Sequence, residues 1–516
     1  MQFDLIIRNG TVIDGTGKTP AFQADVGINN DRIETIGDLS QAETQTEIDA
    51  SGQIVCPGFI DVHVHSEIAL LTGIHRYAEV QQGITTQLLA PDGFGWTGLS
   101  ATQTEELWRY TRFSVGQVDV PLGWQTPENY LSLFPNNSPA NVYPQVPHCA
   151  VRLAICGWDA RPATDIEIAQ MADLTRQWMD AGAGVLNLGL DYQPSANADF
   201  RELVALCKVT AEYGGIYAAH VRYHTIGRRA AWEETIDLSR EANIPVHISH
   251  ERVNDENADI LEKIDRENID LTFESYLYPA GMTHMYMMLP MKYQEGSPDE
   301  VNERLKDPTI RTESITELSN WLGQGNQIVG YTGSGKYIGE RLCDLAQKAN
   351  TTVETFAYDL LCEEHEHQAF VFPWQVTSEE AEDSIRRTVN HPRMMIASDG
   401  IFNIPHPHPR GFGCFARVLG HFARDRDMIS LEEAIYKMSG FPAQRFNIPD
   451  RGELAPGKAA DLVIFNPDTV GAQSTFENPT LPPTGITHVI VNGQSVITHN
   501  EPTGVLPGQV LRHRKP

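Results

Sequence analysis

Two histidines close a short apolar segment in the order Asp61-Val62-His63-Val64-His65. Side chains on a β-strand alternate between its two faces, so a strand here would place Asp61, His63 and His65 on one face and both valines on the other. Imidazole nitrogens and carboxylate oxygens are ligands of divalent metal ions such as Zn²⁺. The segment therefore predicts a strand that ends at a metal site, and the alternative is an ordinary buried strand.

Three further polar residues end apolar segments later in the chain, namely His220, His250 and Asp399. A single histidine at the end of a strand is more often structural, but four histidines and an aspartate together argue for one shared site. His247 has the opposite parity to His250, so we expect it to face the surrounding helices and leave it out of the site.

Strand-like and helix-like segments alternate through the middle of the chain, which indicates a parallel sheet with helical crossovers. Helical patterns cover residues 166–179, 200–213, 230–241 and 258–266. Eight β/α units make a closed barrel, so we expect an α/β protein with a (β/α)8 TIM-like barrel. The eight strand candidates end near His65, Asp92, Gly157, Gly189, His220, His250, Tyr278 and Asp399.

The two ends of the chain carry short apolar runs separated by turn residues. Asn9-Gly10 and Asn29-Asn30-Asp31 are hairpin signals, and similar strands recur near the C-terminus. We expect residues 1–55 and 450–516 to form one small β-sandwich domain, with the barrel over 56–449 between them. About 110 residues separate Tyr278 from His391, so an insertion at about 280–390 needs secondary structure of its own.

The 516-residue composition excludes several classes of protein. The net charge of −29 and pI near 4.9 argue against a nucleic-acid or anionic-membrane partner. No stretch approaches the ~18 apolar residues of a membrane helix, and the charges near the N-terminus do not fit a signal peptide. Seven scattered cysteines without a Cys-x-x-Cys pair indicate a reducing compartment. We expect a soluble cytoplasmic protein, and whether it is a homo-oligomer is left open.

The sequence also resembles the amidohydrolase superfamily, and within it the D-aminoacylase (N-acyl-D-amino-acid deacylase) branch. The resemblance covers nearly the whole chain and depends on a set of motifs, none of which is specific alone. These motifs are Leu5–Gly15, Pro57–His65, Gly83–Thr86, Leu188–Tyr192, His220–Arg222, Ser249–His250, Ser398–Gly400, Pro407–Gly413 and Arg451–Val463.

The resemblance implies a metal-dependent hydrolase that cleaves the amide bond of N-acyl-D-amino acids or similar N-acyl amino acids. It implies one or two divalent ions, with zinc expected, held by the histidines His63, His65, His220 and His250. Asp399 would be a ligand and also the general base and acid. The D preference follows from the resemblance alone.

The sequence leaves two other functional interpretations open. One is a cyclic-amide (hydantoinase-like) or small-peptide hydrolase of the same superfamily. The cyclic-amide enzymes use a lysine at a strand end, and we find none here. The other is an inactive scaffold. The chain retains all four histidines and Asp399, which argues against that interpretation.

One position departs from the family pattern. Related D-aminoacylases carry a cysteine ligand in the loop after Gly-x-Thr-Thr, where this chain has Asp92. A carboxylate is a harder ligand than a thiolate and can bridge two ions. We therefore expect Asp92 to be a metal ligand, and the alternative is an ordinary Asp-Gly turn.

An N-acyl amino acid is an anion, so an acidic protein needs local cations to bind it. Relatives often have a lysine where Arg252 stands and a glutamate where His224 stands, and Tyr276-Leu277-Tyr278 replaces a Tyr-Pro-Tyr run. For the arginines, surface ion pairs are the alternative, and for the tyrosines it is packing. The expected substrate contacts are Tyr192, Arg222, Arg252, Tyr276, Tyr278 and Arg410.

Overall fold

The computed structural model describes residues 2–374 and 376–515. Both ends of the chain contribute to one nine-stranded sheet, in the order β23-β22-β21-β20-β5-β1-β2-β3 with β4 paired to β1. β5 pairs antiparallel with β20, which joins the N-terminal strands to the C-terminal ones. The strands are β1 (Gln2–Val12), β2 (Phe22–Asn29), β3 (Arg32–Gly37), β4 (Glu43–Asp49), β5 (Ile54–Pro57), β20 (Leu462–Phe465), β21 (Ile486–Val491), β22 (Gln494–Thr498) and β23 (Glu501–Pro502).

Turn residues shape this sheet in two different ways. Asn30 adopts a left-handed φ of 53° in the turn between β2 and β3, as the sequence predicts. The hairpin expected at Asn9-Gly10 is wrong, because these residues lie inside β1. Asn9 has a φ of 60°, and the register against β2 shifts between Ile7 and Gly10. The pair therefore makes a bulge in a continuous strand.

The central strands all pair in parallel. One sheet has the order β10-β11-β12-β13-β14-β18, a second has the order β6-β8-β9, and β7 pairs with β19. The strands are β6 (Phe59–Asp61), β7 (Val64–His65), β8 (Ile84–Leu88), β9 (Asn141–Tyr143), β10 (Val146–Pro147), β11 (Val185–Gly189), β12 (Ile216–His220), β13 (Val246–Ile248), β14 (Leu271–Ser275), β18 (Met394–Ile396) and β19 (Gly400–Ile401).

The strand expected to end near Gly157 is wrong. That apolar run forms the helix α4 (His148–Cys156), and the neighbouring parallel strands are β9 and β10. Most of α4 is buried, so its apolar residues face protein on nearly every side. A short, fully buried run has no amphipathic period, so periodicity cannot separate a helix from a strand.

Helices occupy the connections between the parallel strands, and the four predicted segments are confirmed. α5 begins with a capping box formed by Thr164 and Glu167, which satisfies amide groups of its first turn. The helices outside the 280–390 segment are α1 (Glu67–Thr72), α2 (Ala101–Val115), α3 (Pro127–Leu131), α5 (Asp165–Asp180), α6 (Phe200–Glu212), α7 (Tyr223–Ile226), α8 (Arg228–Ala242), α9 (Ala258–Arg266), α16 (Arg410–Arg417), α17 (Leu431–Met438) and α18 (Gly440–Arg445). Short 3-10 turns are η1 (Val80–Gln82), η2 (Pro91–Gly93) and η3 (Ser195–Asn197), and η5 (Val418–Asp425) is a π-helix.

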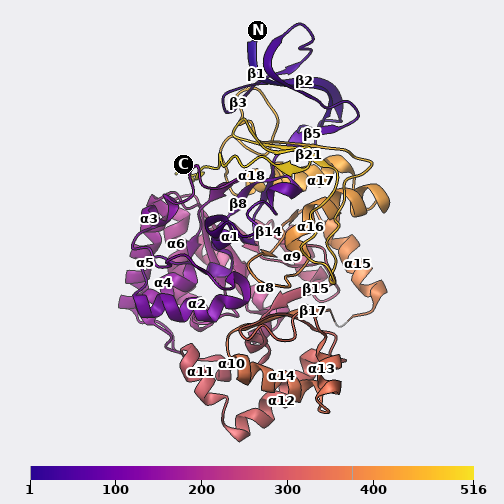
Figure 1. Cartoon of the computed structure of the whole chain (residues 1–516). Helices are drawn as coiled ribbons and strands as arrows, with labels where there is room; N and C mark the ends of the chain where they lie inside the picture. Colours follow the sequence, from indigo (N-terminus) through magenta and orange to yellow (C-terminus); the bar gives the residue numbers. More distant parts are fainter. Residues whose placement is uncertain (1, 375, 516) are drawn as a thin grey trace.

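The segment between β14 and β18 has secondary structure of its own. It contains a three-stranded antiparallel sheet and a group of helices, which lie at the opposite end of the molecule from β1–β3 (Figure 1). An apolar cluster joins it to α2 and includes Phe113 and Met282. Its elements are β15 (Ala280–Thr283), η4 (Met285–Met288), α10 (Met291–Gln294), α11 (Pro298–Arg304), α12 (Pro308–Leu322), β16 (Ile328–Thr332), α13 (Leu342–Lys348), α14 (Val353–Glu364), β17 (Gln368–Pro373) and α15 (Ser378–Val389). Across the described residues, none of the helices is both long enough and apolar enough to span a bilayer.

Candidate metal centre and its cavity

The side chains expected to bind metal all follow the carboxyl ends of parallel strands. His65 ends β7, His220 ends β12, and Asp399 lies between β18 and β19. The Asp399 amide donates to the His63 carbonyl at 2.8 Å, which ties the first and last of these strand ends together. Residues distant in the sequence therefore meet at one place.

The alternation of the strand placed Asp61 on the same face as His63 and His65, but its carboxylate has a different role from theirs. Its carboxylate accepts hydrogen bonds from the Ser398 amide at 3.1 Å and from the His63 amide at 3.1 Å. The described residues that form candidate metal groups do not include it. Asp61 thus holds two strand ends together beneath the site.

Two carboxylates lie among the histidine rings. The His63 Nε2 atom is 3.6 Å from Asp92 Oδ1 and 3.7 Å from Asp399 Oδ1. The His65 Nε2 atom is 3.6 Å from Asp92 Oδ2 and 3.4 Å from Asp399 Oδ1. Such separations suit ligand atoms that each stand about 2 Å from a shared ion.

The other two histidines lie beside this group. His250 Nε2 is 4.0 Å from Asp92 Oδ1 and 3.0 Å from His220 Nδ1. Candidate ligand atoms lie within 4.8 Å of one another in two groups, His63-Asp92-His250 and His63-His65-Asp399. The two oxygens of Asp92 thus face different histidines, an arrangement that fits one ion or two.

Two of the candidate ligand atoms are buried without a hydrogen-bond partner among the described residues. His63 Nε2 and Asp92 Oδ1 are both inaccessible, and neither forms a hydrogen bond within the described chain. A divalent cation satisfies such atoms better than any neighbouring side chain does. The residues present therefore fit a divalent ion.

Asp92 reaches the cluster through strained backbone. It lies in η2 with a φ of 55°, and Ala90 just before it has a φ of 58°. The buried carboxylate of Glu67 accepts a hydrogen bond from the Ala90 amide and fixes this turn. The sequence does contain an Asp-Gly turn here, but its aspartate faces the histidines.

Two carboxylates that the sequence reasoning missed orient the histidine rings. Glu274 on β14 lies 3.3 Å from His63 Nδ1 and also contacts His247, and Asp191 lies 3.2 Å from His220 Nε2. These contacts leave His63 Nε2 and His220 Nδ1 facing the cluster. For Glu274 the available signal was a carboxylate inside a fully buried strand, which needs a partner.

Charge at the site favours a cation. Burial opposes a charged His63, but the nearby carboxylates of Asp92, Glu274 and Asp399 outweigh it and raise the pKa of His63 to about 10. For His250, burial and the neighbouring His220 lower the pKa to about 3, so its ring is neutral. Burial works against ionisation of Asp399, yet Arg410 and the histidines hold the pKa of that carboxyl well below its usual range.

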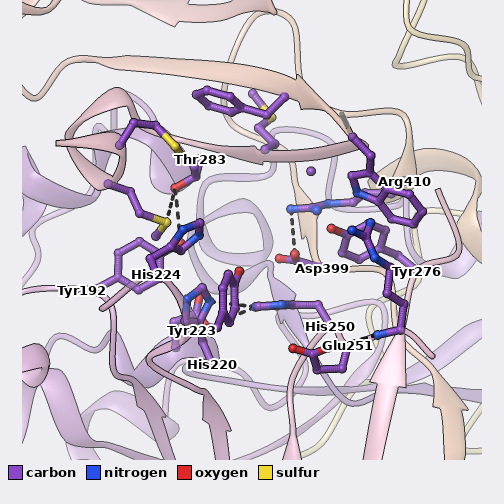
Figure 2. A pocket seen from close by; sticks show the side chains of 18 of the residues that line it. Tyr192, His220, Tyr223, His224, His250, Glu251, Tyr276, Thr283, Asp399 and Arg410 are labelled. Atoms are coloured by element: carbon purple, nitrogen blue, oxygen red, sulfur yellow. Dashed lines mark hydrogen bonds and ion pairs between the residues drawn. The ribbon is translucent and has the colours of Figure 1, made fainter. Parts of the chain in front are cut away.

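A cavity of about 430 Å³ opens over the cluster. Figure 2 shows Asp399 and His250 at its base, with Arg410 directed at Asp399. Arg410 Nη2 is 2.8 Å from Asp399 Oδ2, and its guanidinium lies over the Tyr276 ring at 4.4 Å. A volume of this size suits a small organic ligand.

Four of the six expected substrate contacts line this cavity: Tyr192, Arg252, Tyr276 and Arg410. Arg222 and Tyr278 do not. Arg222 donates to Glu234 at 2.9 Å and to the Ala198 carbonyl at 3.0 Å, because β12 ends at His220 and the chain turns away into α7.

Tyr278 is buried against the His408 ring, at 5.2 Å between centroids, and lies under Arg417. It follows β14 at a point where the chain already leads into β15. Arg222 thus forms an ion pair and Tyr278 packs against other side chains, which are the alternative roles given for these residues from the sequence.

The cavity also contains residues that the sequence did not single out. Several come from β15, η4 and α12 in the segment between β14 and β18, or from α2. Among these are Phe113, Met282, Thr283, Met287, Met288, Asn320 and Trp321.

Comparison with known proteins finds relatives over nearly the whole chain. A family model described as "Amidohydrolase family" matches residues 365–497. The chain is 34% identical over 527 residues to a D-aminoacylase of Alcaligenes xylosoxydans xylosoxydans, covering 99% of this chain and 97% of that protein. It is 30% identical over 519 residues to an N-acyl-D-glutamate deacylase of the same organism, covering 99% and 97%.

A solved structure is similar over the same extent. The N-acyl-D-glutamate deacylase from Bordetella bronchiseptica, complexed with zinc and a phosphonate mimic of the tetrahedral intermediate, has a TM-score of 0.82 at 30% sequence identity. The match covers 99% of this chain and 100% of that one. This chain belongs to the amidohydrolase family.

Proposed function

We propose that this protein is a metal-dependent hydrolase that cleaves the linear amide bond of N-acyl-D-amino acids. The observation that supports it most is the convergence of His63, His65, Asp92, His250 and Asp399 beneath a cavity. Arg252 lines this cavity, and its guanidinium forms no ion pair with the described residues. The relatives named D-aminoacylase and N-acyl-D-glutamate deacylase supply the reaction and the D configuration. No lysine lines the cavity among the described residues, which argues against a cyclic-amide hydrolase that uses one.

The metal is zinc, as one or two ions, in keeping with the zinc bound by the relative of known structure. Its ligands are His63, His65, Asp92, His220, His250 and Asp399. When bound, a zinc ion lowers the pKa of a coordinated water and polarises a substrate carbonyl. Asp191 and Glu274 hold the rings so that one nitrogen of each partner histidine faces the ion.

Asp399 moves the proton of the reaction. Its carboxylate takes a proton from the attacking water, whose oxygen bonds to the acyl carbon, and returns that proton to the amine as the C–N bond breaks. Arg410 keeps the carboxylate ionised and fixes its direction through the 2.8 Å contact. One water is consumed, and a carboxylic acid and a free amino acid are released.

Arg252 binds the α-carboxylate of the substrate. Its guanidinium lies over the Trp374 ring at 3.7 Å and, within the described chain, forms no ion pair. A guanidinium that lines a cavity without a partner suits a planar carboxylate, to which it donates two parallel hydrogen bonds. Tyr192 and Tyr276 line the cavity beside it and complete the contacts to the amide and acyl groups.

We also propose the domain organisation that carries this site. The parallel strands close into a (β/α)8 TIM-like barrel over residues 56–449, with an insertion at about 280–390. Residues 1–55 and 450–516 form a β-sandwich domain. The order of the parallel strands and the pairing of β7 with β19 support closure, and the cysteines of the described chain are all free, which supports a reducing compartment such as the cytoplasm.

The test is a substrate panel on purified protein, stripped of metal and reloaded with zinc. We expect hydrolysis of N-acetyl-D-amino acids, little hydrolysis of their L isomers and no ring opening of hydantoins. Activity should disappear on chelation and return with zinc. Absence of turnover across the whole D panel in protein shown to bind zinc would overturn the proposal.

A further inference from the structure

The guanidinium of Arg252 has one close neighbour among the described residues, and that neighbour is an aromatic ring. The other two arginines that line the cavity, Arg228 and Arg410, are paired with carboxylates. The hydrogen bonds that Arg252 forms with described residues involve its backbone. Its guanidinium carbon lies 3.7 Å from the centroid of the Trp374 ring. The position of this cation in the cavity therefore depends on the indole.

Trp374 is held by the antiparallel sheet of the segment between β14 and β18. It follows β17 directly, and its amide donates a hydrogen bond to the Pro279 carbonyl at 3.0 Å. Pro373, just before it, pairs with Ala280 on β15. The indole is partly buried and packs against the main apolar core. It therefore extends from the end of a paired strand and not from a free loop.

The same segment also holds the backbone beside Arg252. The amide of Val253 donates to the Thr388 hydroxyl at 2.8 Å, and the Ser384 hydroxyl donates to the Val253 carbonyl at 2.8 Å. Both hydroxyls belong to α15. Arg252 is part of the loop after β13, but the segment between β14 and β18 contacts this loop through α15 and contacts the guanidinium through Trp374.

Stacking of this kind leaves a guanidinium able to bind an anion. The indole face attracts a cation more strongly than the other aromatic rings do. It contacts the flat face of the guanidinium, so the N–H groups at the edge stay available for a carboxylate. Arg410 shows the same arrangement with its edge occupied, since it lies over Tyr276 at 4.4 Å and its Nη2 atom is 2.8 Å from Asp399.

We propose that Trp374 is the positioning residue of Arg252, and that its indole holds the guanidinium ready for a carboxylate before the substrate arrives. The inference rests on the proposed function, in which Arg252 binds the α-carboxylate. A long side chain without this support would be ordered only on binding, and the lost freedom would weaken the complex. The segment between β14 and β18 thus supplies the support, and the barrel supplies the cation.

The first experiment measures binding without hydrolysis. A ketone analogue of N-acetyl-D-alanine, in which a methylene group replaces the amide nitrogen, is compared with its primary carboxamide, which lacks the negative charge. Calorimetry on zinc-loaded wild-type protein should show about 100-fold tighter binding of the carboxylate form. Trp374→Leu should lower this ratio by about 10-fold and leave the affinity for the carboxamide nearly unchanged, because only the carboxylate uses the guanidinium.

A double-mutant cycle separates positioning from general damage. In protein that already carries Arg252→Met, Trp374→Leu should not weaken carboxylate binding further, whereas independent effects would add. Trp374→Phe keeps an aromatic face and should retain most of the ratio. Trp108→Leu is the matched control, because Trp108 lies under Arg112 at 3.9 Å but neither residue lines the cavity.

The variants also separate this inference from the proposed reaction. Trp374→Met is made beside Trp374→Leu, since a flexible side chain refills a partly buried site with little disturbance. A wild-type ratio in either variant, folded by circular dichroism, would overturn the inference and leave the reaction intact. Equal binding of both analogues by the wild-type protein would also overturn it, whatever the substrate panel shows. Loss of the ratio in a protein that hydrolyses no amide would support the inference and contradict the reaction.

Discussion

The proposed metal cluster and the apolar part of the cavity wall, which includes Met282, Met287 and Met288, are neighbours built in different ways. Each proposed ligand follows a parallel strand, and further groups hold several of them: Glu274 for His63, Asp191 for His220 and Arg410 for Asp399. The methionines of the wall come from β15 and η4, and apolar contacts position them. Directed polar contacts fix a geometry, whereas flexible apolar side chains adapt to what they contact.

Because of this difference, we expect the two parts of the chain to have different roles in the reaction. Under the proposed function, the strand ends carry the ligands and the proton-transfer group, so we expect them to determine which bond is broken. We expect the segment between β14 and β18 to affect which substrate fits, because it supplies most of the uncharged wall. Changes in the first part should therefore affect kcat or metal binding, and changes in the second should affect the choice of substrate.

Asp399→Asn should have the largest effect of any single change. Asparagine keeps the shape of the side chain but cannot accept the water proton, so kcat should fall by about 10³-fold or more. The circular dichroism spectrum should stay the same. Kinetics on zinc-loaded protein measures the loss, and Asp173→Asn, an exposed residue on α5, is the matched control. A variant that keeps a tenth of the wild-type kcat would contradict this role of Asp399, since another group would then transfer the proton.

The sequence could predict the strand ends because their signal is local. An apolar run that stops at a histidine or aspartate shows both the strand and its polar end, as at 216–220 and 394–399. The position of Asp92 was predicted differently, from the family pattern after Gly-x-Thr-Thr. Amphipathic helices such as α8 and α9 were also found, because their buried face repeats with the helical period.

The features of the site that the sequence did not predict depend on contacts between distant residues, which no local sequence pattern contains. Arg222 follows His220 by two residues, but the chain turns at the strand end and leads its guanidinium to Glu234. Nothing in the sequence around Met287 shows that it will face a cavity instead of the core. α4 was mistaken for a strand, and Glu274 was missed because its partners, His63 and His247, lie on other strands.

The two arginines Arg252 and Arg222 test which cation belongs to the cavity. Arg252→Met should raise KM by about 100-fold with a smaller change in kcat, because the substrate carboxylate loses its partner. Arg222→Met should leave KM nearly unchanged but lower the free energy of unfolding by about 3 kcal/mol, since Glu234 and two carbonyl groups lose a largely buried donor. Steady-state kinetics and urea unfolding on both variants measure these effects. The opposite pattern would show that the residues had been assigned the wrong roles.

Glu274→Gln tests how much of the cluster depends on its supporting carboxylates. Burial disfavours the charged form of Glu274, but His247 and His63 outweigh this and hold the pKa of the carboxyl below its usual range. A neutral amide should therefore orient His63 less well and weaken zinc binding by about 10- to 100-fold. Competition with a chelating dye measures the affinity directly. Glu262→Gln on the exposed face of α9 is the control, and equal affinities for both variants would contradict a supporting role.

His284→Phe should have the smallest effect, and it tests the wall alone. His284 stacks on Phe113 at 4.5 Å between centroids, and neither ring nitrogen has a partner in the described chain. Burial lowers the pKa of His284 to about 3, whereas an unfolded histidine titrates near about 6.5. Between these values the unfolded chain binds a proton that the folded chain does not, so stability falls as the pH falls. From pH 7 to pH 5.5 this histidine should remove about 1 kcal/mol of unfolding free energy, and phenylalanine should abolish that part of the loss. Urea unfolding at both pH values decides the matter, because an identical loss in both proteins would mean that the His284 ring accepts a proton in the folded protein.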